Sequence, residues 1–406
     1  MPVDVLRCRI CESDYPALAN GICVRCFGPL EPVYDWDELA SVVTRERIEA
    51  GPQSLWRYAD LLPAVPPPDA ANAPGMTPLV PAPRLASALG IGEVFLKLDL
   101  ANPTHSFKDR VVAVAAAKAK EFGLDTLSAT STGNLANAVG ARAAALGMRA
   151  IIFCPAGLEA EKFKATTIYG ATIYSVRGSY DDCSRLVSEL AGEVEWGIVN
   201  VNLRSYYAEG SKTLAFELSE QLGWETPSAV VMPIGSGAMF TKVWQGFQQF
   251  ERLGLIGGGQ PRLYGGQAEG CSPVASAFAD ERRVSPVRPA SIVSSIAIGN
   301  PADGDLAIAT ARKSGGAIYA VPEDEVGDNI ALLAETAGIF GEGATGVAIG
   351  ALREMAARAD VGEPDRVVVI VSGTGLKTPQ LATPSGSAIE IEADVDALLD
   401  QLGVTA

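Results

Sequence analysis

Short apolar runs alternate with longer, alanine-rich amphipathic stretches along most of the chain that follows Val94. Short runs rich in β-branched residues are typical of strands, and longer stretches with apolar positions three and four apart are typical of helices. The pattern predicts strands at Leu127–Thr130, Ala150–Cys154, Ala171–Val176, Ala229–Ile234, Arg262–Gln267 and Arg366–Val371. It predicts helices at Val111–Lys120, Leu135–Leu146, Glu159–Tyr169 and Phe240–Leu253.

This alternation predicts an α/β fold built from βαβ units, with parallel sheets wrapped by helices. The strands are almost entirely apolar, as strands covered on both faces are. We expect a large lobe formed by residues 33–105 and 206–406 and a small lobe formed by residues 106–205. A site is expected in the crevice between them, at the carboxyl ends of strands. Residues 60–84 contain eight prolines without periodicity and predict an irregular connector.

Composition and charge narrow the classes of function. The chain has 406 residues, of which 48% are hydrophobic and 20% charged, which fits a globular protein with a large core. Its formal net charge of −16 argues against a nucleic-acid partner, because phosphates require a basic surface. No run of about 18 apolar residues is present, so we expect no membrane span. The first residues do not read as a secretion signal, so we expect a cytoplasmic protein.

Four cysteines lie within the first 26 residues, in two C-x2-C hooks made by Cys8, Cys11, Cys23 and Cys26. Two such hooks can supply four thiolates to one tetrahedral zinc ion, so residues 1–32 are interpreted as a zinc-ribbon-like segment. A ribbon that binds no metal and reduced thiols without a role are the alternatives. The other three cysteines lie in or beside apolar stretches and are expected to be buried: Cys154, Cys183 and Cys271.

The segment NPTHSFKDRVV (102–112) places Lys108 at the entrance of a predicted buried helix. A buried lysine loses its charge because desolvation disfavours the ammonium, and a neutral amine can form a Schiff base with an aldehyde. The alternative is a salt bridge to Asp109 or another acid. His105, the only histidine of the chain, is expected to be a loop residue with local contacts.

Three polar loops follow predicted strands. Residues 131–134 (STGN) suit a carboxylate, residues 235–239 (GSGAM) could direct backbone N–H groups at a phosphate, and residues 372–377 (SGTGLK) form a third polar junction. Taken singly, each could be an ordinary cap or tight turn. Taken together with a reactive lysine, they are the parts needed for pyridoxal phosphate and an amino-acid substrate.

These motifs resemble those of the threonine synthase family, within the tryptophan-synthase-β-like (fold-type II) group of pyridoxal-phosphate enzymes. The resemblance extends from the cysteine ribbon to about Pro379. This sequence departs from the family pattern at Thr378, where similar sequences often carry aspartate, and in the segment FGEGATG (340–346). The motifs that carry it are GMTPLV (75–80), NPTHSFKDR (102–110), STGNLANA (131–138), NLRSYYAEGSKT (202–213), PIGSGAMFTKVWQGF (233–247), SSIAIGNP (294–301) and SGTGLKTP (372–379).

The resemblance implies roles for individual residues. Lys108 would carry the cofactor and shuttle protons, Asn134 would contact the cofactor's phenolic oxygen, and Ser372 would face its pyridine nitrogen. The cofactor's phosphate would be held by Gly235, Ser236, Gly237, Ala238 and Met239. The residues implied for the substrate are Ser131 and Thr132 for its carboxylate and Asn202, Arg204 and Lys212 for its phosphate.

The function implied is conversion of O-phospho-L-homoserine and water to L-threonine and phosphate, by a homodimer. One alternative is a related enzyme that catalyses β-elimination or β-replacement on serine, threonine or another activated amino acid, which would need no second phosphate site. The other alternative is a catalytically silent regulator or a metal-ribbon binding protein on the same fold.

Overall fold

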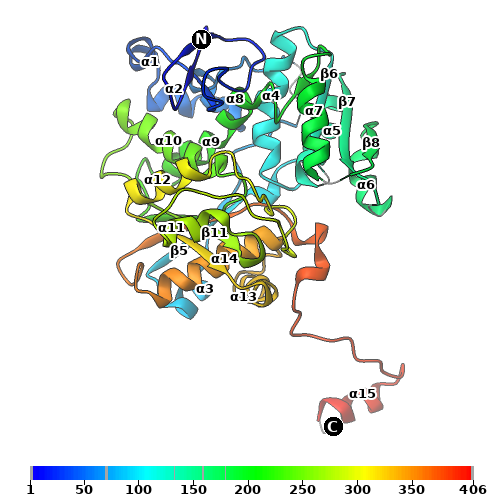
Figure 1. The fold of residues 1–406 in the computed structure, drawn as a ribbon. Coiled ribbons are helices and arrows are strands. Elements are labelled where there is room, and N and C mark those ends of the chain that lie inside the picture. The colour runs from blue at the N-terminus through cyan, green and yellow to red at the C-terminus, as the bar shows by residue number, and fades with distance from the viewer. Residues whose placement is uncertain (1–2, 69–71, 132, 158–159, 179, 404–406) are drawn as a thin grey trace.

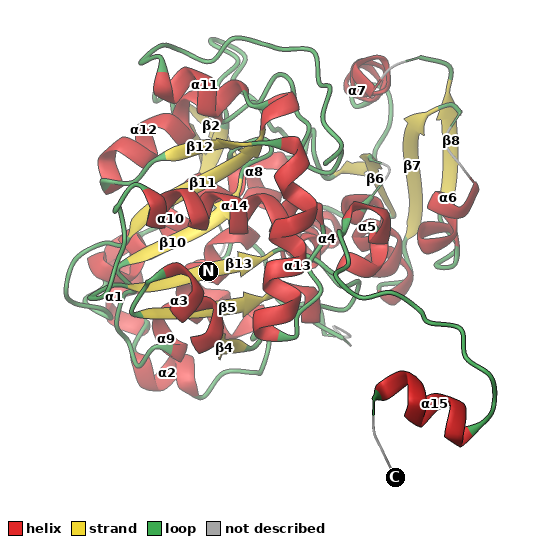
Figure 2. Ribbon diagram, turned by 90° about the horizontal axis from the view of Figure 1, so that it is seen from below, coloured by secondary structure: helices red, strands yellow, loops and turns green. Residues whose placement is uncertain are grey.

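The computed structural model describes residues 3–403 except 69–71, 132, 158–159 and 179, and it contains three β-sheets. Two of the sheets are wrapped by helices and stand side by side, and the third lies in the N-terminal segment (Figures 1 and 2). The α/β architecture with parallel sheets that the sequence predicts is therefore confirmed.

The largest sheet has six strands in the order β12-β11-β10-β13-β5-β4, all parallel except the edge pair β4–β5. Its strands are β4 (Leu79–Pro81), β5 (Glu93–Leu98), β10 (Ala229–Pro233), β11 (Arg262–Ala268), β12 (Ile318–Val321) and β13 (Arg366–Val371). Successive residues of the central strand β10 enter different clusters, because side chains alternate between the faces of a sheet. Val231 packs in one cluster and Val230 in the other.

Helices cover both faces of this sheet, so its strands are apolar on both sides. One cluster joins the sheet to α3 (Pro83–Leu89), α13 (Val326–Ala337) and α14 (Gly343–Ala357). On the other face pack α9 (Lys212–Gln221), α10 (Ala238–Arg252), α11 (Pro273–Ala279) and α12 (Gly304–Ser314).

The second sheet has four parallel strands in the order β8-β7-β6-β9. They are β6 (Thr126–Thr130), β7 (Arg149–Pro155), β8 (Thr172–Val176) and β9 (Gly197–Ile198), and their helices are α5 (Asn134–Ala145), α6 (Ala160–Thr167) and α7 (Tyr180–Leu190). Between this sheet and the large one lies α4 (Lys108–Glu121), against which the short α8 (Arg204–Tyr207) packs.

Two details differ from the sequence-based predictions. The connector at residues 60–84 contains strand β4, which pairs antiparallel with β5. Three residues ending in a proline carry no periodic signal, and proline is tolerated there because β4 is an edge strand. The other detail is β8, whose residues are half-buried or exposed, because it is the edge of the small sheet.

The N-terminal segment forms a small antiparallel sheet that packs against α8. Its strands are β1 (Val5–Cys8), β2 (Asp14–Pro16) and β3 (Leu30–Pro32), followed by α1 (Trp36–Val42) and α2 (Arg45–Glu49). Ser205 Oγ donates to the carbonyl of Asn20 at 3.2 Å, and Tyr206 Oη donates to the carbonyl of Leu18 at 3.0 Å. The loop between the two cysteine hooks is thereby attached to α8.

At the other end of the chain, α15 (Val395–Leu402) lies away from the body at the end of an extended segment (Figure 1). Among the residues that the structure describes, no helix combines the length and apolar character needed to cross a bilayer.

A buried ion network fixes α4 to the large sheet. Arg110 is 0% exposed and pairs with Asp99 at 2.7 Å and with Glu217, and Lys97 pairs with Glu217 at 2.6 Å. Thr77 Oγ1 completes the network by donating to Asp99 at 2.8 Å. These contacts join β5 and α9 to the helix that begins with Lys108, so they hold the start of that helix in place.

We expect Glu217→Gln to lower the free energy of unfolding by about 3–5 kcal/mol, because Arg110 and Lys97 would be left with too little counter-charge in a buried site. Urea denaturation at pH 7 measures this value. Glu363→Gln is the matched control, since Glu363 is exposed, and it should change stability by less than about 0.5 kcal/mol. Equal stability of Glu217→Gln and the wild type would contradict the role assigned to the network.

The loss of stability caused by Glu217→Gln should depend on pH. Burial raises the pKa of Glu217, but the charges and hydrogen bonds of Arg110 and Lys97 outweigh it and lower the pKa from 4.5 to about 2. Because the folded-state pKa is the lower one, the stabilisation is present above pH 4.5 and is lost as pH falls toward 2. The difference in stability between wild type and Glu217→Gln should therefore narrow across this window.

Candidate active site

Three loops of the large sheet meet at one edge, because they follow adjacent parallel strands. Strand β13 lies between β10 and β5, and all three run in the same direction. The chain leaving β10 forms residues 235–239, the chain leaving β13 forms residues 372–377, and the chain leaving β5 leads to Lys108. Ligands of open α/β sheets bind at such carboxyl edges.

Lys108 is the first residue of α4, and the loop after β13 holds the segment before it. Phe107 N–H donates to the carbonyl of Ser372 at 2.8 Å, and Ser106 forms a β-bridge with Gly373. The Lys108 side chain is half-buried, whereas a fully buried amine was expected. Its Nζ lies 5.4 Å from the centre of the Phe107 ring and makes no hydrogen bond or ion pair with the described residues.

Asp109 is not the ion-pair partner of Lys108, which was the alternative interpretation of this lysine. Its carboxylate is buried and accepts hydrogen bonds from Thr104, at 2.7 Å from the backbone N–H and at 2.9 Å from Oγ1. Burial raises the pKa of Asp109, and the hydrogen bonds from Thr104 oppose the rise. The Lys108 amine therefore forms no ion pair with this carboxylate.

His105 is a loop residue, as expected. It is exposed and adopts a left-handed conformation with φ of 60°. Its backbone N–H donates to the carbonyl of Asn102 at 2.7 Å, and its carbonyl accepts from Thr374 N–H at 3.2 Å. These contacts tie the loop before Lys108 to the loop after β13.

A buried carboxylate, that of Glu342 at the N-terminal boundary of α14, joins two of the predicted cofactor contacts. Its side chain is 4% exposed. Ser372 Oγ donates to Glu342 Oε1 at 2.8 Å, and Asn134 Nδ2 donates to Glu342 Oε2 at 2.7 Å. Asn134 begins α5 of the small sheet, so this carboxylate connects the two lobes at the site. The second N–H of the Asn134 amide makes no hydrogen bond with the described residues.

Lys377 lies on the other side of the Asn134 amide. Its Nζ donates to Asn134 Oδ1 at 2.8 Å and to the carbonyl of Thr104 at 2.5 Å. The amide of Asn134 is therefore oriented by a carboxylate at its nitrogen and an ammonium at its oxygen. Burial lowers the pKa of Lys377, and the carboxylates of Glu342 and Asp109 oppose the shift.

The loop after β10 leads into α10, whose N-cap residue Gly237 has no side chain to cap the first turn, although Ala238 N–H donates to Ser236 Oγ at 3.5 Å. Gly237 has a φ of 92°, and a Cβ there would lie 2.8 Å from the carbonyl oxygen of Asp303, so only glycine fits. Asp303 N–H fixes the turn by donating to the carbonyl of Ser236 at 2.9 Å. Uncapped N–H groups at the start of a helix suit a phosphate.

The small sheet contributes the loop after β6. Ser131 is half-buried, and its Oγ accepts from Gly133 N–H at 3.3 Å instead of capping the first turn of α5. Ordinary capping by Ser131 therefore does not account for this loop. Thr132, the other residue predicted to bind the substrate carboxylate, lies outside the described residues.

Asn202 and Lys212, two of the three residues implied for the substrate phosphate, hold internal contacts. Asn202 Oδ1 accepts from Ile198 N–H at 2.8 Å, and its Nδ2 donates to the carbonyl of Trp196 at 2.9 Å. Lys212 is 0% exposed, and its Nζ pairs with Glu209 at 2.5 Å. Both side chains stabilise the fold locally in this structure.

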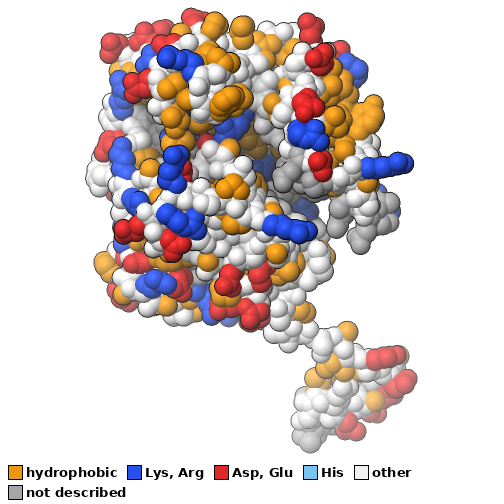
Figure 3. Space-filling model, viewed as in Figure 1, with side chains coloured by type: hydrophobic (Ala, Val, Ile, Leu, Met, Phe, Trp, Pro, Cys, Tyr) orange, Lys and Arg blue, Asp and Glu red, His pale blue; other side chains and the backbone are white. Residues whose placement is uncertain are grey.

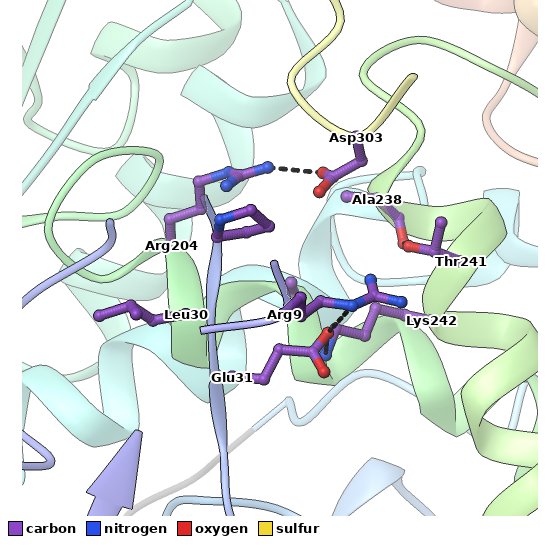
Figure 4. A pocket seen from close by; sticks show the side chains of 10 residues that line it. Arg9, Leu30, Glu31, Arg204, Ala238, Thr241, Lys242 and Asp303 are labelled. Carbon is purple, nitrogen blue, oxygen red and sulfur yellow. Dashed lines mark hydrogen bonds and ion pairs between the residues drawn. The ribbon is translucent and has the colours of Figure 1, made fainter. Parts of the chain in front are cut away.

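Arg204, the third of these residues, lines a small pocket between the N-terminal segment and the start of α10 (Figure 4). Its guanidinium pairs with Asp303 at 2.6 Å, and the side chain is 19% exposed. Figure 4 shows the Arg204 guanidinium directed at the Asp303 carboxylate and the Arg9 guanidinium directed at Glu31. None of the residues lining this pocket is Lys108, Asn134 or Ser372.

The four N-terminal cysteines form a compact cluster, with all four Sγ atoms within 4.8 Å of one another. Burial raises the pKa of the Cys23 thiol, but hydrogen bonds led by that of the Tyr15 hydroxyl, which lies 3.0 Å from Sγ, outweigh it and lower the pKa to about 6. A thiolate is the form that binds a metal. Cys154, Cys183 and Cys271 are buried, as predicted, and none of them forms a disulfide bond.

Comparison with known proteins assigns the family. The family model described as pyridoxal-phosphate dependent enzyme matches residues 70–373. The chain belongs to this family. It is 34% identical over 397 residues to the threonine synthase of Methanocaldococcus jannaschii, covering 97% of this chain and 98% of that protein. It is 32% identical over 402 residues to the threonine synthase of Methanosarcina acetivorans, covering 98% of each chain.

Solved structures show the same fold. The processed form of threonine deaminase isoform 2 from Solanum lycopersicum aligns with a TM-score of 0.64 at 19% identity, covering 90% of this chain and 92% of that chain. Maize serine racemase aligns with a TM-score of 0.61 at 18% identity, covering 80% and 92%. The pyridoxal-phosphate dependence and the resemblance to threonine synthases that the sequence indicated are confirmed by the family match and the relatives.

Glu342 and Lys377 are the site residues that sequence reasoning missed. Lys377 stands in the quoted motif SGTGLKTP, but a lysine after a glycine-rich turn gives no indication of its partners. Glu342 precedes a helix by one residue, where an acidic side chain usually indicates only a favourable interaction with the helix dipole. Both were found through contacts between segments far apart in the sequence.

We expect Glu342→Ala to weaken cofactor binding about tenfold, because Ser372 and the Asn134 amide lose the acceptor that orients them. Titration of the apoprotein with pyridoxal phosphate, followed by visible absorbance, measures the dissociation constant. Glu363→Ala, an exposed change, serves as the control. Unchanged affinity in Glu342→Ala would show that these two groups are positioned without the carboxylate.

Proposed function

We propose that the protein converts O-phospho-L-homoserine and water to L-threonine and phosphate. The observation that carries this proposal is the end-to-end similarity to relatives named threonine synthase, which covers at least 97% of this chain in two of them. The geometry supports it, since the Lys108 amine, which has no hydrogen-bond or ion-pair partner among the described residues, lies at the sheet edge where the glycine turn at 235–237 and the loop at 372–377 also meet.

The residues present fit pyridoxal phosphate. The start of α10, where Gly237 supplies no side-chain cap, and the glycine turn at 235–237 suit its phosphate. Lys108 suits its aldehyde carbon, and the Asn134 N–H that has no partner among the described residues suits its phenolic oxygen. We propose that Ser372 faces the ring nitrogen. When bound, the cofactor withdraws electrons from the substrate and so acidifies the hydrogens on Cα and Cβ.

The protein's own groups then move protons. The Lys108 amine takes the proton from Cα, and proton transfer at Cβ allows the Cγ–O bond to break, with phosphate leaving with the bonding electrons. A water oxygen bonds to Cβ and releases a proton to a base, and protons return to Cα and Cγ. The loop at 131–134 would hold the substrate carboxylate during these steps, and Ser131 would be one of the residues that bind it.

One observation favours a second candidate, an enzyme that catalyses β-elimination or β-replacement on serine, threonine or another activated amino acid. The predicted phosphate-binding set at 202–212 is not assembled as a free anion site, because Arg204 pairs with Asp303 and Lys212 pairs with Glu209. An enzyme acting on serine or threonine needs no second phosphate site. Product analysis on phosphohomoserine, threonine, serine and O-acetylserine distinguishes the two candidates.

We further propose that the four-cysteine cluster holds one structural zinc ion and that the protein is a cytoplasmic homodimer. Four sulfur atoms within 4.8 Å of one another suit tetrahedral coordination of one ion.

We also propose boundaries for the two lobes. The large lobe would consist of residues 33–105 and 206–406, and the small lobe of residues 106–205. The four strands of the small sheet lie within the second range.

We expect Lys108→Ala to reduce phosphate release from phosphohomoserine by about 10³-fold or more, because it removes both the group that carries the cofactor and the proton shuttle. Steady-state phosphate detection measures the rate, and visible absorbance reports the covalently held cofactor. Lys313→Ala, which changes an exposed residue of α12, should behave as the wild type. A wild-type enzyme that consumes threonine or serine but not phosphohomoserine would overturn the proposed reaction.

We expect one zinc ion per chain by elemental analysis after expression with zinc, and its loss in Cys11→Ser. Chelation should lower the melting temperature, because a metal that binds only the folded ribbon stabilises it. Cys271→Ser, outside the cluster, should keep the metal. Full metal content in Cys11→Ser would exclude the cluster as the binding site.

A further inference from the structure

Lys377 is a cation in the crevice whose partners carry no charge. Its Nζ donates to an amide oxygen, that of Asn134, and to a backbone carbonyl, that of Thr104. No carboxylate of the described residues forms an ion pair with it. The side chain is half-buried, so part of it remains accessible to solvent. A partly desolvated ammonium with only neutral acceptors gains strongly from an incoming anion.

Its position places it beside the other groups of the site. Thr104 lies four residues before Lys108, and Asn134 begins the helix that follows the loop at 131–134. The backbone of Lys377 belongs to the loop after β13, which also carries Ser372. Figure 3 shows the surface hollowed between the two lobes, with Lys and Arg side chains within the hollow.

We propose that Lys377 binds the phosphate group of the substrate and thereby determines specificity for a phosphorylated amino acid. This inference rests on the proposed function and names the cation of its second phosphate site. Lysine is a common point-charge ligand for phosphate. Binding requires only that Nζ exchange a neutral acceptor for a phosphate oxygen, so no existing ion pair is broken.

The other cations considered for this role are already neutralised. Arg204 would have to leave Asp303, to which it is held at 2.6 Å, and Lys212 would have to leave Glu209 in a fully buried site. Breaking a buried ion pair by removing one partner costs about 3–5 kcal/mol. Lys377 binds an anion without that cost, which is why the structure favours it over the two residues implied by the sequence.

The test compares two probes on the holoenzyme: inorganic phosphate, which supplies the anion alone, and L-threonine, which supplies the α-carboxylate without a phosphate. Binding is followed by calorimetry for phosphate and by cofactor absorbance for threonine. In Lys377→Gln, we expect phosphate to bind about 10- to 100-fold more weakly, as for loss of a charged hydrogen bond, while threonine affinity changes less than about twofold. Lys377→Arg should retain most of the phosphate affinity.

Two controls make the result interpretable. Lys313→Gln removes an exposed lysine and should leave both affinities unchanged. Arg204→Gln should leave phosphate affinity within about twofold, whereas a large loss there would assign the phosphate to Arg204 and overturn the proposal. The cofactor content and melting temperature of each variant verify that the fold is intact, and Lys377→Arg supplies the comparison if Lys377→Gln does not fold.

Each remaining outcome is decisive. Equal loss of threonine and phosphate affinity would mean that Lys377 binds the carboxylate, and no loss of either would mean that it only orients Asn134. Absence of saturable phosphate binding in the wild type would also overturn the proposal. Failure of the wild type to release phosphate from phosphohomoserine would overturn the proposed reaction. The phosphate comparison would still test Lys377, so the two failures can be distinguished.

Discussion

The carboxylate of Glu342 accepts one hydrogen bond from each lobe, and the geometry of the site depends on this sharing. Ser372 reaches it from the large sheet and Asn134 from the small one. A buried carboxylate is costly unless its oxygens are satisfied, so the two lobes are favoured in the arrangement that satisfies both. Lys377 completes the arrangement from the opposite side of the Asn134 amide. Two charged groups thus orient one neutral amide between the lobes.

The large sheet supplies the frame on which these contacts form. Parallel pairing of β10, β13 and β5 brings three loops to one edge, although they are separated by more than 100 residues in the chain. Behind that edge, Arg110 and Glu217 fix the helix that begins with Lys108. The reactive amine therefore stands on a rigid element, and its own side chain carries no internal partner among the described residues.

Charge neutralisation separates residues that stabilise the fold from those available to a ligand. Lys212, Arg110 and Arg204 each pair with a carboxylate, and these pairs lie between elements of the body. Lys108 and Lys377 lie in the crevice without such a partner in the described part of the chain. Cations that already have a counter-charge are therefore assigned structural roles. The two lysines that have none are assigned to the site.

The amino-acid pattern by itself determined the fold class, most strand positions and the identity of the lysine, because apolar periodicity and short motifs are local signals. Arg366–Val371 was predicted with the bounds it has in the structure, and Leu127–Thr130 was one residue short. Strand β4 was missed because three residues at a sheet edge leave no period to detect. The partners of Arg204, Glu342 and Lys377 were decided by tertiary contacts over long sequence separations. A motif specifies which side chains are present, but the charge that each one meets depends on which segments the fold brings beside it.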